Sequence, residues 1–102
     1  MLNLRIGVTD DTTPTDMDRY FTNLWKYKQK LILTFDTSQC DRISFRQIMK
    51  LRPVLNKHRV NSRKYIKHTT IIVKNGITCN LLKLALCFIR TENPVYVNYT
   101  KQ

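Results

Sequence analysis

The stretch Leu31-Ile32-Leu33-Thr34-Phe35-Asp36 decides the fold of this chain. Its first five residues are almost all apolar, and the run ends at a carboxylate. A short, nearly continuous apolar run is typical of a strand that is covered on both faces, as strands are in parallel sheets. We therefore expect residues 31–35 to form a buried strand of a parallel sheet.

Three other stretches predict strands on either side of this run. Residues 2–8 alternate apolar and polar side chains, which is the period of a strand. Residues 69–73 are a β-branched run, and residues 95–99 follow a proline, which favours an edge position in a sheet. The residues expected in the buried centre of this sheet are Ile32, Leu33, Ile71 and Ile72.

Apolar residues at helical spacing separate the expected strands, and capping residues mark where the helices begin. Thr13 is suited to cap a first helix, with Pro14 at its first position. Ser44 begins a capping box for a second helix, which Pro53 should kink or break. A third helix is expected after residues 75–76, with Thr78 as its cap.

The expected order is strand, helix, strand, helix, strand, helix, strand. This alternation predicts an α/β fold with a four-stranded, mostly parallel sheet and three crossover helices, in one domain over residues 1–102. It leaves open whether the helices cover both faces of the sheet or mainly one. A chain of this length also leaves little volume for a large enclosed lipid or cofactor pocket, although a surface cleft is not excluded.

The chain carries no signal for a membrane or for export. No apolar run is long enough to span a bilayer, and the first residues lack a basic segment followed by an apolar one. The three cysteines are odd in number and widely spaced, which favours free thiols in a reducing compartment. We expect an intracellular protein, cytoplasmic or nuclear. The Asn-, Lys-, Ile- and Thr-rich composition suits an AT-rich coding source such as a virus.

Charge is the strongest functional signal in the sequence. The formal net charge is +11, and it is distributed unevenly along the chain. Residues 1–41 hold five basic and six acidic residues, whereas residues 42–102 hold thirteen basic residues and a single acid, Glu92. This asymmetry is typical of proteins with an anionic partner, such as nucleic acid, an acidic protein surface or anionic lipid head groups. A basic surface that merely keeps the protein soluble is the open alternative.

Nine of these cations fall in an acid-free stretch and form the predicted partner-binding surface: Arg42, Arg46, Lys50, Arg52, Lys57, Arg59, Arg63, Lys64 and Lys67. On the second helix, Arg42, Arg46, Lys50 and Lys57 are expected to share an exposed face opposite an apolar stripe. Contacts of such side chains with phosphates do not depend on base sequence.

The residues that would support catalysis are not arranged in any familiar motif. His58 and His68 are interpreted as exposed surface histidines, and no cysteine lies beside a base in a recognisable pattern. Metal-ligand spacings are absent, and two glycines are too few for a phosphate-binding loop. We therefore expect no catalytic residues, no metal and no cofactor, and interpret the chain as a non-enzymatic binding module.

In its expected order of strands and helices and in several short motifs, the chain resembles the STAS family and its Sec14-like relatives. STAS domains occur in anti-sigma-factor antagonists and in the tails of sulfate transporters. The resemblance extends over about residues 4–99 and rests on residues 6–9, 31–38, 71–75 and 94–97. It implies a protein-interaction or scaffolding module, with functional loops at the strand ends around Asp36, Ser38 and Asn75. The first strand of the family is missing here, and Ser44 is the nearest residue to the family's phosphorylated serine.

Two functions follow from these observations. The preferred one is a STAS-like protein-interaction module that uses its basic second helix as the contact surface. The alternative is a small nucleic-acid- or chromatin-associated protein that binds the phosphate backbone electrostatically. The last strand, with an unpaired edge, also predicts a weak homodimer.

Overall fold

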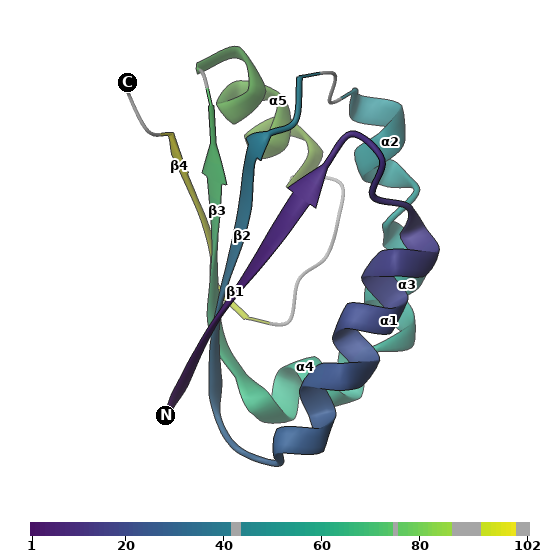
Figure 1. The fold of residues 1–102 in the computed structure, drawn as a ribbon, viewed down its shortest axis with the longest axis vertical. Helices are drawn as coiled ribbons and strands as arrows, with labels where there is room; N and C mark the ends of the chain where they lie inside the picture. Colours follow the sequence, from purple (N-terminus) through teal and green to yellow (C-terminus); the bar gives the residue numbers. More distant parts are fainter. Residues whose placement is uncertain (42–43, 75, 87–92, 100–102) are drawn as a thin grey trace.

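The computed structural model describes residues 1–41, 44–74, 76–86 and 93–99 (Figure 1). Within these ranges, strands and helices alternate as the sequence predicts. The elements are β1 (Leu2–Thr9), α1 (Pro14–Leu24), the short 3-10 helix η1 (Trp25–Tyr27), β2 (Leu31–Gln39), α2 (Phe45–Met49), α3 (Arg52–Lys57), α4 (Arg59–Tyr65), β3 (Ile66–Val73), α5 (Gly76–Leu86) and β4 (Val95–Tyr99).

The four strands form one parallel sheet in the order β1-β2-β3-β4. Each new strand is therefore added on the same side of the one before it. Since crossovers between parallel strands are right-handed, such an order places every connecting helix on the same face. Figure 1 shows the helices gathered on one side of the twisted sheet. The question that the sequence left open is thus decided in favour of one covered face, and β4 lies at an edge as predicted.

Burial along β2 alternates because only one face of the sheet is covered. Leu31, Leu33 and Phe35 are buried against the helices, whereas the residues between them are half-buried. The expectation of a strand buried on both faces was wrong. Of the four residues expected in the buried centre, Leu33 is buried, whereas Ile32, Ile71 and Ile72 are half-buried. The uncovered face includes Ile32 and Ile72, because each alternates with a residue that packs in the core.

Most of the predicted helix signals are confirmed. Thr13 and Ser44 both act as N-caps in complete capping boxes. The predicted break at Pro53 separates α2 from α3, and the proline occupies the first turn of α3. Thr78 does not cap the last helix, because α5 begins at Gly76 and Thr78 lies inside it.

Strand β2 is longer than the predicted residues 31–35 and continues to Gln39, through the positions of Asp36 and Ser38 where a loop was expected. Its last residue, Gln39, pairs with Thr9 on β1. The buried hydroxyl of Thr37 donates a hydrogen bond of 2.7 Å to the Ile72 carbonyl on β3. Asp36 and Ser38 therefore lie within the strand rather than in a loop at its end, because their neighbours remain bonded to both flanking strands.

A cavity of about 420 Å³ lies between the covered face of the sheet and the helices. Its interior is mainly apolar and includes Phe21, Phe35, Leu55 and Ile71. Its exposed charged residues show that the cavity is partly open to the surface, so it is a cleft of the kind that the sequence did not exclude.

Candidate functional site

The basic segment folds into three short helices, α2, α3 and α4, on the outer side of the helical layer. Their cations form what we call the basic helical surface: Arg46, Lys50, Arg52, Lys57, Arg59, Arg63 and Lys64, all of them exposed. Lys67 is also exposed but lies on β3. Arg42 lies outside the described residues.

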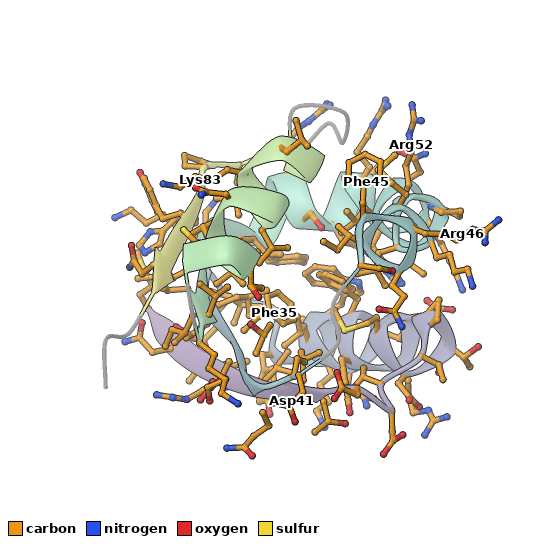
Figure 2. The ribbon with its side chains drawn as sticks, turned by 90° about the horizontal axis from the view of Figure 1, so that it is seen from above. Phe35, Asp41, Phe45, Arg46, Arg52 and Lys83 are labelled. Carbon is orange, nitrogen blue, oxygen red and sulfur yellow. The ribbon has the colours of Figure 1, made fainter. Side chains whose placement is uncertain are left out.

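Arg46 and Arg52 are both exposed guanidinium groups of this surface. Figure 2 shows both projecting outward from the helices, away from the core residue Phe35. Lys50 is exposed between them in sequence, at the end of α2. Among the residues that the structure describes, none of these three cations has an ion-pair partner. They can therefore meet an anion without first breaking a protein contact.

Lys57 is turned away from this group and toward α1. Its Nζ lies 2.8 Å from an oxygen of Asp18, which also contacts His58. Hydrogen bonds from Lys57 and then His58 hold the pKa of Asp18 below its ordinary value. The expected shared face of Arg46, Lys50 and Lys57 is therefore wrong for Lys57. Because the chain breaks at Pro53, helical periodicity does not carry over from α2 into α3.

His58 is buried, with 6% of its surface exposed, so its interpretation as a surface histidine was wrong. Its ring stacks on Phe21 at 5.4 Å, and its Nδ1 accepts a hydrogen bond from the indole of Trp25. This network fastens α1 to the junction of α3 and α4, which holds the basic helical surface in place. His68 is half-buried and lies edge-on against Tyr96 on the uncovered face of the sheet.

Sequence reasoning missed three exposed cations, Lys26, Lys28 and Lys30, that join the predicted Lys64 and Lys67 at the end of the molecule where β2 and β3 begin. The Nζ of Lys30 donates a hydrogen bond of 2.8 Å to the Lys64 carbonyl, and the next residues pair as Leu31 with Ile66. This contact unites cations from both halves of the chain in what we call the lysine end: Lys26, Lys28, Lys30, Lys64 and Lys67. The available signal was a second acid-free stretch, residues 19–35.

The opposite end of the sheet, where β1 and β2 finish, carries acidic residues. The carboxylate of Asp10 accepts a hydrogen bond from the backbone N–H of Asp41. Asp41 in turn forms an ion pair of 2.7 Å with Lys74, which raises the pKa of that lysine. Positive charge is concentrated on the helical side and at the lysine end, although Lys50 and Arg59 line the same cavity as Asp10 and Asp11.

The predicted strand-end residues are placed differently from what the STAS resemblance implies. Asp36 lies on the uncovered face, paired with Arg5 of β1 and accepting a hydrogen bond from the Ser38 N–H. These bonds from Ser38 and Arg5 lower the pKa of Asp36 to about 2. Asn75 lies outside the described residues. Asp36 and Ser38 therefore stabilise the sheet where a loop was expected.

Ser44 begins α2, and its hydroxyl accepts a hydrogen bond of 3.2 Å from the Gln47 N–H. The Gln47 side chain accepts one from the Ser44 N–H in return. The hydroxyl is therefore already used in capping, although the residue is exposed. Phosphorylation at Ser44 stays a prediction.

Other reactive groups offer no centre in the described part of the chain. There, no three His, Cys, Asp or Glu side chains gather in a way that could hold a metal ion. Cys40 and Cys79 are buried free thiols, and burial raises the pKa of Cys40 to about 11. Within residues 1–41, 44–74, 76–86 and 93–99, no helix has both the length and the apolar character needed to cross a bilayer.

Comparisons with known proteins add no relative to this description. No family model matches the chain, and searches of curated proteins and of solved structures find no match either. The resemblance to STAS domains therefore stays a prediction.

Proposed function

We propose that this protein binds the phosphate backbone of nucleic acid through its basic helical surface. The observation that carries the proposal is the group of exposed cations Arg46, Lys50 and Arg52, which have no anionic partner among the described residues. Cations placed in this way attract phosphates and release bound counterions when they bind. Arginine also offers two parallel N–H groups that match a phosphate.

The length of the protein is suited to binding a long polyanion. The Cα extent of the protein along its longest axis is 35 Å, and the helical layer runs along that axis (Figure 1). The layer begins near α2 and ends at α4, beside the lysine end. This length corresponds to about one turn of a nucleic-acid duplex, which repeats every 34–36 Å or so.

The same surface offers little to a packed protein interface. Among the described residues, the exposed large apolar side chains are Met1, Tyr27, Val60, Leu84 and Tyr96, and of these only Val60 lies on α2–α4. Stable protein interfaces have an apolar or aromatic centre. This lack of apolar surface favours the nucleic-acid function over the STAS-like protein-interaction module. Binding to an acidic protein stays the alternative function.

The test is charge reversal at the accessible arginines. The double variant Arg46→Glu, Arg52→Glu is compared with Lys74→Glu, Lys83→Glu, which changes the net charge equally but elsewhere (Figure 2 labels Lys83 on α5). Binding to a labelled DNA duplex and to a labelled RNA strand is followed by fluorescence anisotropy over a salt series. Circular dichroism checks that every variant is folded.

We expect the arginine variant to bind at least about ten-fold more weakly, with a salt slope smaller by about two units, one for each lost phosphate contact. The lysine variant should keep most of the affinity. Equal losses in both variants would mean that net charge alone attracts the nucleic acid. Absence of binding by the unmodified protein, even at low salt, would refute the function.

A further inference from the structure

The cavity between the sheet and the helices contains a buried polar group that lacks a partner. Thr69 lines the cavity and is only 8% exposed. It pairs with Leu33 on β2, so its side chain lies on the covered face of the sheet. Its backbone N–H donates to the Pro94 carbonyl at 3.0 Å, but its hydroxyl has no hydrogen-bond partner among the described residues.

This state of Thr69 is unusual, because buried hydroxyls are almost always hydrogen-bonded. Thr37 on the neighbouring strand shows the ordinary arrangement, since its buried hydroxyl donates to the Ile72 carbonyl. A threonine hydroxyl can donate one hydrogen bond and accept others. The Thr69 hydroxyl is therefore available to a molecule inside the cavity.

The remaining lining defines the character of that molecule. The interior is formed by apolar side chains such as Phe21, Phe35 and Leu55. The charged lining residues, which are Asp10, Asp11, Lys50 and Arg59, are all exposed and so lie at the rim. A charge buried in the interior would lose its hydration without gaining a partner. The occupant must therefore be uncharged where it meets the core.

We propose that the cavity binds a small, mainly apolar, uncharged molecule whose single hydroxyl or carbonyl group shares a hydrogen bond with Thr69 Oγ. The volume of 420 Å³ falls within the usual range of small-molecule sites. The lining also includes Val8 and Thr37, near the carboxyl ends of β1 and β2, where open α/β sheets commonly receive ligands. The apolar interior of this site is separate from the basic helical surface, and the two share only the rim residues Lys50 and Arg59.

Two probes that differ by one hydroxyl test the proposal: 1-naphthol and naphthalene. Each is titrated against the full chain, and its binding is measured by displacement of the neutral fluorophore N-phenyl-1-naphthylamine. We expect both probes to bind saturably at one site. We expect 1-naphthol to bind about three- to ten-fold more tightly than naphthalene, because it forms one additional hydrogen bond with a buried hydroxyl.

Two variants assign the binding to this cavity. Thr69→Val keeps the shape of the side chain and removes the hydroxyl, so it should make the two probes bind equally. Leu55→Phe fills part of the cavity and should weaken both probes at least ten-fold or so. If the unmodified chain binds neither probe, or if naphthol stays preferred in Thr69→Val, the proposal is wrong. Unchanged probe binding in a folded Leu55→Phe would also overturn it, because the probes would then bind elsewhere.

Discussion

The indole N–H of Trp25 donates a hydrogen bond of 3.0 Å to Nδ1 of His58, across 33 residues of sequence. Because Nδ1 is the acceptor, the imidazole proton lies on Nε2, which is 2.5 Å from a carboxylate oxygen of Asp18. The two contacts join η1 and α1 to the residue between α3 and α4. The basic helical surface is therefore built on a partly buried polar network centred on His58.

Replacing Trp25 with phenylalanine tests this network. The variant keeps an aromatic ring against Phe21 but leaves Nδ1 of buried His58 without its donor. We expect the free energy of unfolding to fall by about 1–3 kcal/mol, as measured by urea unfolding followed by circular dichroism. Tyr27→Phe, at an exposed position, is the control and should change it by less than about 0.5 kcal/mol. Equal effects of the two changes would contradict the role of the hydrogen bond.

The ionised carboxylate of Asp36 should contribute stability that is lost in acid. Its pKa is about 2 in the folded protein, below its ordinary value of 3.8, owing to hydrogen bonds from Ser38 and Arg5. The folded protein binds this proton less readily than the unfolded chain. The stabilisation is therefore fully present above about pH 4 and is lost as the pH falls through about 2.

The expected result is that Asp36→Asn flattens the decline in stability between these two pH values. Thermal unfolding at a series of pH values measures it. Asp11→Asn provides the same change of charge away from the Arg5 contact, and it should leave the acid decline as in the unmodified protein. A decline that is identical in all three proteins would exclude Asp36 as its source.

Ile71 and Ile72 are neighbours in β3 that should respond differently to the same change. Ile71 packs against both core clusters beneath the helices, whereas Ile72 pairs with Asp36 on the uncovered face. We expect Ile71→Thr to lower the free energy of unfolding by about 2 kcal/mol, because it puts a hydroxyl in the core and removes a methyl group. Ile72→Thr should cost less than about 1 kcal/mol. Comparable losses, measured by urea unfolding, would mean that both faces are covered.

Cys40 should be unreactive in the folded protein. Its thiol is buried and donates a hydrogen bond of 3.2 Å to the Val8 carbonyl. Burial, together with Asp10, raises its pKa to about 11, so almost no thiolate is present near neutral pH. We expect iodoacetamide to modify Cys40 only after unfolding in guanidinium chloride, as mapped by mass spectrometry. Rapid modification of the native protein would show that this region opens.

The sequence was sufficient to predict those structural features that depend on residues close to one another along the chain. The strand at residues 95–99, the caps Thr13 and Ser44 and the break at Pro53 were all predicted, because strand period, capping and proline geometry act within a few residues. The charge asymmetry was also visible in the sequence alone. It indicated a basic surface before any helix was placed.

Only the tertiary structure decided which faces of the strands and helices are buried and which residues they contact. The strand order left one face of the sheet uncovered, which left Ile72 half-buried on that face and placed Asp36 beside Arg5. Contacts between distant residues buried His58, turned Lys57 toward Asp18 and brought Lys30 to Lys64. The physical reason is that a residue's burial and partners depend on which segments pack around it, and that packing is determined by pairings between strands and helices far apart in the chain.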